Sequence, residues 1–185
     1  TDANGQFVIR SENTRAPSRR PMLITVEATV TDESQQAISA RTTVMAHPAN
    51  IYVGLRADRY FGREGQPTEI GLIAVTPDSE PVAGKRIDLT VTEIRWTRVE
   101  REGEFGRYDW RREEIEVETG SVVTCDDGTA SYTFSPSQAG IYRVRAVVMD
   151  EKERTNSAAL RFWVMGARPV WWGRPSDTID LVADK

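Results

Sequence analysis

The sequence predicts an all-β protein made of tandem antiparallel β-sandwiches of the immunoglobulin-like class. Apolar and polar residues alternate along most of the 185 residues, which is typical of half-buried strands. Gly, Pro, Asn and Asp cluster between these segments at the spacing that short strands require. Residues 111–118 have helical propensity, but Ile115 and Val117 alternate with glutamates there, so we expect a strand.

An internal repeat is the third observation. Residues 23–39 match residues 141–157, which lie 118 positions later in the chain. In the same way, residues 55–59 recur at residues 181–185. The spacing is about the length of one small domain. We therefore expect a piece of a longer tandem array, which favours a scaffold or binding role over catalysis.

The repeat divides the chain into three parts. We expect residues 1–47 to hold the last strands of a preceding domain, residues 51–166 to form one complete sandwich, and residues 167–185 to provide a linker and the first strand of a following domain. We also expect the joints at Pro48 and at residues 169–175 to be ordered, because they set the angles between domains.

Strands of the first part are expected over residues 6–10, around Val26 and over residues 38–46. The last two are separated by the polar residues 33–36, which predicts a β-hairpin.

In the complete domain the sequence pattern predicts first the strands 51–58 and 68–75, then a long strand through Ile87 and Trp96 and a return strand through Trp110 and Val117. Residues 122–124 are expected in a hairpin with 129–134, and the last two strands are expected at residues 139–149 and 156–164. Residues 62–67 are expected to form the first turn.

Two local features refine this expectation. In the long strand the apolar phase jumps by one residue between Val91 and Ile94, so we expect a β-bulge and a bend near Glu93. Tyr142 opens the penultimate strand after the corner that contains Gly140. Its hydroxyl is therefore expected to hydrogen-bond to the corner backbone, as in a tyrosine corner.

The complete domain resembles the macroglobulin-type domains of bacterial alpha-2-macroglobulin-like proteins. The stretches that carry the resemblance are residues 52–55, 65–67, 75–84, 127–130 and 139–144; residues 30–32 and 181–185 look like strands of neighbouring macroglobulin domains. The chain has Asp78-Ser79 where the family often has Asp-Gly, which is expected to change only the turn type.

The resemblance implies that the parent is a large extracytoplasmic protein of the periplasm that traps proteases, either free there or anchored to the membrane. In this family a protease cuts an exposed bait segment, the array rearranges, and in many members a Cys–Gln thioester captures the attacker. Cys125 is followed by Asp126-Asp127-Gly128, so the thioester is not in this segment. The implied partners are neighbouring macroglobulin domains and, through the full-length protein, target proteases.

Composition excludes several classes of function. The net charge is −4, with 24 Lys and Arg interleaved with 28 Asp and Glu, so no nucleic-acid-binding face is indicated. No apolar run is long enough to span a membrane. The single cysteine, Cys125, cannot form an intrachain disulfide.

No catalytic, cofactor-binding or metal-ligating residues are predicted. Cys125 is expected to be a semi-buried residue at a strand end, since no His or Lys lies near it in the sequence. Residues 126–128 predict a hairpin turn and not a calcium loop. His47 is the only histidine, so neither a histidine-dependent metal cluster nor a His-based triad is expected, and His47 before Pro48 is expected to be a linker residue.

Two segments allow a functional hypothesis beside a structural one. Arg98, Arg101 and Arg107 belong to an Arg-rich hairpin, which is either a protease-exposed segment or a solvated β-hairpin that resists cleavage; we favour the second. Trp171 and Trp172 in the following linker either contact a neighbouring domain, which we favour, or form a platform for sugars.

The leading hypothesis is a non-catalytic structural segment of an alpha-2-macroglobulin-like protease inhibitor. The alternative is an adhesin or carbohydrate-binding β-sandwich that uses Trp171 and Trp172. An enzyme is the least favoured of the three.

Overall fold

The computed structural model describes residues 4–10, 20–100 and 108–167. These residues contain β-strands and no helix, and accordingly no helix that could span a membrane. The chain divides into two compact units, residues 1–48 and 49–185.

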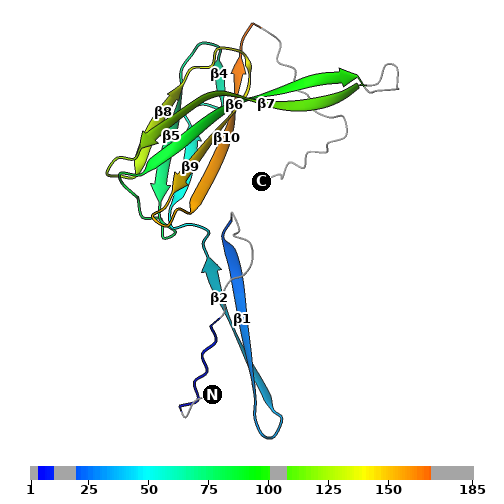
Figure 1. Ribbon diagram of the computed structural model, residues 1–185, viewed down its shortest axis with the longest axis vertical. Helices are drawn as coiled ribbons and strands as arrows, with labels where there is room; N and C mark the ends of the chain where they lie inside the picture. Colours follow the sequence, from blue (N-terminus) through cyan, green and yellow to red (C-terminus); the bar gives the residue numbers. More distant parts are fainter. Residues whose placement is uncertain (1–3, 11–19, 101–107, 168–185) are drawn as a thin grey trace, which may run out of the picture. The chain divides into compact units, whose positions relative to one another are not determined.

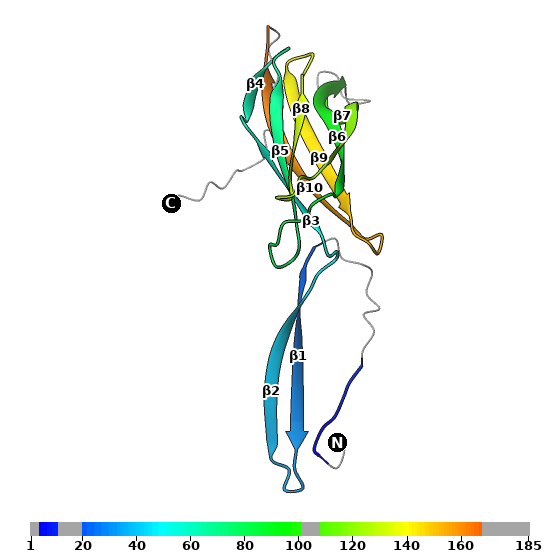
Figure 2. The same cartoon turned by 90° about the vertical axis from the view of Figure 1, so that its left-hand side faces the viewer.

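The first unit contains one antiparallel hairpin, formed by β1 (Met22–Thr31) and β2 (Ala37–Ala46) (Figure 2). The predicted hairpin is therefore confirmed. The strand expected over residues 6–10 is absent. A strand needs a neighbouring strand for its hydrogen bonds, and the sheet described in this unit consists of β1 and β2.

The second unit is a sandwich of two sheets (Figure 1). The larger sheet has the order β4-β10-β9-β6-β7 and the smaller one the order β3-β5-β8. All pairs are antiparallel except β4 with β10. The bounds are β3 (Tyr52–Ala57), β4 (Phe61–Arg63), β5 (Thr68–Val75), β6 (Arg86–Glu100), β7 (Tyr108–Val123), β8 (Thr129–Phe134), β9 (Gly140–Met149) and β10 (Thr155–Met165).

The core lies between the two sheets. Alternate residues of the central strands point inward and are buried, as Ile70 and Leu72 on β5 and Val144 on β9 show. At one end of the core Tyr142 stacks on Phe162 with ring centroids 5.7 Å apart. The predicted class, an all-β immunoglobulin-like sandwich, is confirmed.

Two predicted elements differ from the structure. Phe61–Arg63 form the edge strand β4 at the start of the segment expected to be a turn. Residues 122–123 end β7, and β8 pairs with β5 in the other sheet, so the expected hairpin of 122–124 with 129–134 is wrong. The alternation of apolar residues identified these strands, but it carries no information on their partners.

The predicted bulge occurs on the neighbouring strand. The register of β6 and β7 shifts between Val91 and Thr92, where β7 holds Val117 as an extra residue. By contrast, β6 pairs with β9 without interruption from Ile87 to Ile94. The phase jump in β6 is therefore a change of face: Glu93, opposite Tyr142, takes the inward position, while Ile94 lies on the other face of the strand, where it is also buried.

The two copies of the sequence repeat have the same structure. Ala28 pairs with Ala40 in β1–β2, and Ala146 pairs with Ala158 in β9–β10, so the two hairpins share one register. Their turns also agree, because Gln35 and Glu153 occupy equivalent positions with φ of 64° and 61°.

Candidate functional site

Asp150 is a heavily hydrogen-bonded side chain of the sandwich. It is buried in the turn between β9 and β10. Its Oδ1 accepts the N–H groups of Lys152 and Arg154 at 2.9 and 3.0 Å. Its Oδ2 accepts Arg154 Nε and the N–H of Asn50, both at 2.9 Å. Burial alone would raise the pKa of Asp150, but these donors hold it well below its usual value. Asp150 therefore fixes the turn and the entry to β3.

A second charged group lies at the opposite end of β9. The Glu93 side chain is 7% exposed and forms a bidentate pair with Arg95, with both N–O distances at 2.7 Å. This hydrogen bond raises the pKa of Arg95. The Tyr142 hydroxyl donates to the carbonyl of Gln138 at 2.8 Å, which confirms the predicted tyrosine corner. Burial, and then the charge of Glu93, raise the pKa of Tyr142 to about 12.

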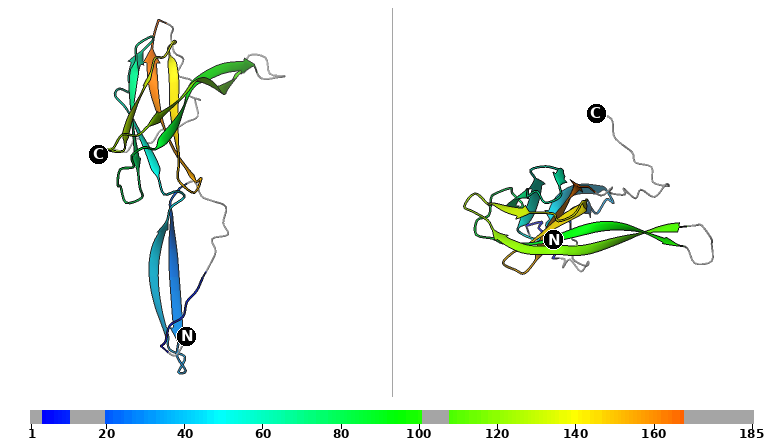
Figure 3. Two further views of the ribbon diagram at one scale, coloured as in Figure 1. Left: turned by 60° about the vertical axis from the view of Figure 1, so that its left-hand side comes forward. Right: turned by 90° about the horizontal axis from the view of Figure 1, so that it is seen from above.

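The Arg-rich segment forms a two-stranded arm, in which Arg95–Glu100 of β6 pair only with β7 and lie beyond β9 (Figures 1 and 3). At its base Glu114 bonds to Arg112 and Arg143. Arg98 lies in β6 with its backbone opposite Trp110; Arg101 and Arg107 lie outside the described residues.

The turn that holds Cys125 is a tight connection between the two sheets. Asp127 Oδ1 accepts the Thr129 hydroxyl at 2.7 Å and the Thr129 N–H at 2.9 Å, and these bonds lower the pKa of Asp127. Cys125 is exposed. The expected semi-buried position is therefore wrong, because β7 ends at Val123 and Cys125 belongs to the turn.

A shallow groove of about 540 Å³ lies on the β3-β5-β8 sheet. Gly54 and Gly71 leave part of its floor as bare backbone, and Ile73 and Thr129 line it from the outer face. Arg56 is the charged residue among the described residues of the lining. The groove thus has no acid–base pair in its described lining, and it offers a mainly apolar surface beside one guanidinium group.

An exposed aromatic pair was missed by sequence reasoning. Phe61 of β4 stacks on Trp163 of β10 with ring centroids 5.5 Å apart and an angle of 21°. Trp163 is only partly buried and lies on the outer face of the larger sheet. The adjacent aromatics Tyr60-Phe61, just before the predicted turn at residues 62–67, were the available signal.

The described residues show no cluster of metal-ligating side chains. Within residues 4–10, 20–100 and 108–167, no three His, Cys, Asp or Glu side chains come together as metal ligands would. Trp171 and Trp172 lie outside the described residues. The candidate functional features of the sandwich are therefore surfaces, namely the β6–β7 arm, the groove on the smaller sheet and the Phe61–Trp163 pair.

Comparison with known families assigns the fold. The family model described as "Bacterial macroglobulin domain 6" matches residues 54–165, from β3 to the end of β10. The chain belongs to this macroglobulin-domain family. In the macroglobulin domain the position of the expected Asp-Gly turn holds Ser79 with φ of 69°, a conformation that glycine adopts more readily.

Curated and solved relatives agree with this assignment. The macroglobulin segment is 25% identical over 166 residues to an alpha-2-macroglobulin homolog of Nostoc sp., covering 89% of this chain and 9% of the relative. It thus spans about a tenth of the length of that protein. Native E. coli alpha-2-macroglobulin matches 86% of this chain, with 12% of its own length covered, a TM-score of 0.56 and 14% identity. Salmonella alpha-2-macroglobulin reacted with methylamine matches 78%, with 10% covered, a TM-score of 0.50 and 16% identity.

Proposed function

We propose that this macroglobulin segment is a non-catalytic structural part of a protease-trapping protein of the alpha-2-macroglobulin type. The observation that carries the proposal is the family match over the whole sandwich, residues 54–165. A solved protein of the same fold is E. coli alpha-2-macroglobulin activated by porcine elastase, with a TM-score of 0.51 and 16% identity. The bait segment and any thioester would lie in other parts of the polypeptide.

The bare face of the β1–β2 hairpin supports a tandem arrangement. Val26 is 48% exposed, whereas Val144, its equivalent in β9–β10, is fully buried by the opposing sheet. An alternating apolar face of this kind is stable when a second sheet covers it. We propose that residues 1–47 end a preceding macroglobulin domain, and that residues 167–185 lead into a following one.

The role of the segment would be to position its neighbours and transmit their rearrangement after a protease cuts the bait. A sandwich with a continuous core and a fixed turn at Asp150 suits this mechanical role. We place the parent protein outside the cytoplasm, in the periplasm, where it would meet foreign proteases.

The test is protease capture by the full-length protein. After incubation with an elastase-type protease, we expect protease and polypeptide to co-elute in size-exclusion chromatography. Cleavage of a large protein substrate should fall at least tenfold, while a short peptide substrate, which can enter a trap, is still cleaved. A protease that elutes at its own size and cleaves both substrates at unchanged rates would refute the proposal.

A further inference from the structure

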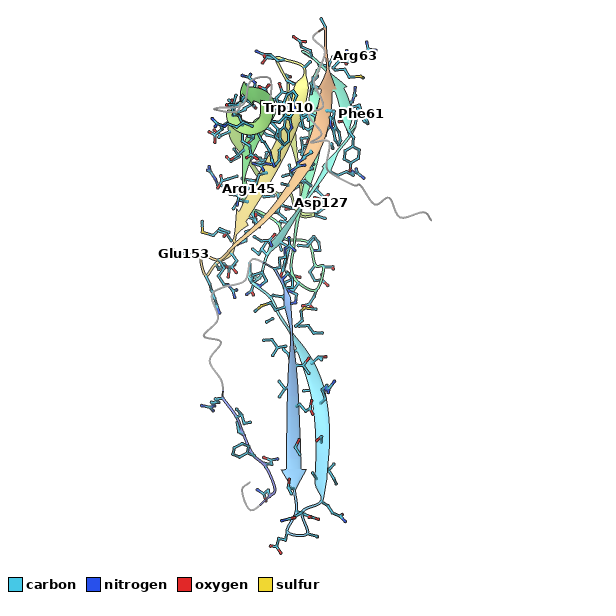
Figure 4. The ribbon with its side chains drawn as sticks, turned by 90° about the vertical axis from the view of Figure 1, so that its right-hand side faces the viewer. Phe61, Arg63, Trp110, Asp127, Arg145 and Glu153 are labelled. Carbon is cyan, nitrogen blue, oxygen red and sulfur yellow. The ribbon has the colours of Figure 1, made fainter. Side chains whose placement is uncertain are left out.

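The outer face of the larger sheet carries a continuous apolar row. The pairing registers place Phe61 beside Trp163, and Trp163 beside Ile141, so that one row crosses β4, β10 and β9. Phe61 remains 60% exposed although one face of its ring stacks on Trp163. Figure 4 shows Phe61 and Arg63 together on β4, next to β10.

Charged and sulfur-containing side chains flank this row. Arg63 pairs in register with Met165, which is 52% exposed, on one side, and Arg161 pairs with Arg143 on the other. We call the following set the aromatic patch: Phe61, Arg63, Ile141, Arg161, Trp163 and Met165. Aromatic residues, Met and Arg are the types enriched at the centres of protein–protein interfaces, and exposed apolar clusters commonly mark such interfaces.

The charge of the patch selects the kind of partner. Arg143 is paired with Glu114, but Arg63 and Arg161 have no acidic partner among the described residues. Arg145, labelled in Figure 4, lies on the same outer face of β9 and is likewise unpaired in the described part. The rim is therefore cationic although the chain as a whole is acidic, with net charge −4. A second copy of this chain would bring the same cationic patch, which repels, or acidic residues that are scattered. An apolar surface with carboxylates at its rim therefore fits the patch better.

We propose that the aromatic patch docks against a carboxylate-rimmed apolar surface on another domain of the same polypeptide. The proposal rests on the proposed function, because the segment spans about a tenth of its curated relative and the remaining domains would supply the partner. The apolar row would provide the affinity, while Arg63 and Arg161 would select the acidic rim.

Site-specific photo-crosslinking in the full-length protein tests the proposal. The photo-reactive amino acid p-benzoylphenylalanine replaces Phe61, and the matched control replaces Thr133, which is exposed on the outer face of the other sheet. We expect crosslinks from position 61, mapped by mass spectrometry, to an acidic segment of the same polypeptide outside residues 1–185, at least fivefold more than from position 133.

Charge reversal provides the second arm. Arg63→Glu with Arg161→Glu should lower the crosslink yield at least fivefold, whereas Arg63→Lys with Arg161→Lys should retain it, with thermal unfolding unchanged in both. Crosslinks confined to residues 168–185, crosslinks to a different protein, or a yield indifferent to charge reversal would overturn the proposal. Protease capture measured in parallel separates the two proposals: lost capture with intact crosslinking would refute only the proposed function.

Discussion

At the scale of single residues, Asp150 shows how one carboxylate organises several backbone groups. It accepts N–H groups from the turn that it belongs to and from Asn50 at the entry to β3. Its repeat equivalent, Asp32, accepts only the Gln36 N–H and the Ser34 hydroxyl, and it is exposed. The same residue type in the same turn is thus buried and makes more hydrogen bonds in one copy than in the other, because Asp150 lies in a complete sandwich and Asp32 does not.

The lowered pKa of Asp150 predicts a pH-dependent stability. In the unfolded chain Asp150 takes up its proton at a higher pH than in the folded chain. The contribution of ionised Asp150 to the free energy of unfolding is therefore complete above about pH 5 and is lost as the pH falls below about 4. We expect Asp150→Asn to lower the free energy of unfolding at pH 7 by about 1–3 kcal/mol, and this deficit to shrink at pH 3. Urea denaturation at both pH values measures it. Asp32→Asn is the control and should leave unfolding of the sandwich unchanged.

Gly128 and Gly65 form a second matched pair. Their φ angles are 75° and 73°, so both favour glycine. A Cβ on Gly128 would lie 2.9 Å from the Ala74 carbonyl oxygen and 2.9 Å from the Val82 nitrogen, whereas a Cβ on Gly65 meets nothing within 4 Å. We expect Gly65→Ala to cost roughly 1–2 kcal/mol and Gly128→Ala about 1–3 kcal/mol more. Equal midpoints in guanidinium denaturation would contradict this.

At the scale of elements, β6 explains why one prediction was only half right. The sequence shows the phase jump between Val91 and Ile94, and a bulge is the usual cause of such a jump. The structure instead turns Glu93 inward, where Arg95 compensates its charge, and places the extra residue Val117 on β7. A buried charge opposite Tyr142 cannot be inferred from periodicity, because its partner is defined only by packing.

The two hairpins predict opposite outcomes for one substitution. Val144 is fully buried and Val26 is 48% exposed at the equivalent position. We expect Val144→Ala to destabilise the sandwich by about 1–3 kcal/mol and Val26→Ala to change its stability by less than about 0.5 kcal/mol, as measured by thermal unfolding of this chain. In the longer polypeptide, Val26→Ala should become as costly as Val144→Ala. If it stays neutral there, no preceding sheet covers β1–β2.

At the scale of the whole molecule, the sequence predicted the class of fold and the repeat better than it predicted surfaces. Alternation indicates which side chains of a strand are buried, and turn residues indicate where strands end. Together they predicted the β-sandwich class. The pairing of β8 with β5 and of the edge strand β4 with β10 joins segments that are distant in the sequence. Alternation gives no information on such pairing. The aromatic patch was missed for the same reason: Phe61 and Trp163 lie far apart in sequence and meet only because β4 pairs with β10.

The shared register of the two hairpins has a consequence for folding. A polypeptide with several alike hairpins risks inserting one of them into the wrong domain. Side-chain volume opposes that exchange, since Ile24 and Val44 occupy the positions at which Tyr142 and Phe162 stack in β9–β10. A misplaced β1–β2 would leave a cavity costing several kcal/mol, on the order of 3–5 for each lost ring. The presence of aromatic side chains in one hairpin and aliphatic ones in the other therefore opposes the exchange of hairpins between domains.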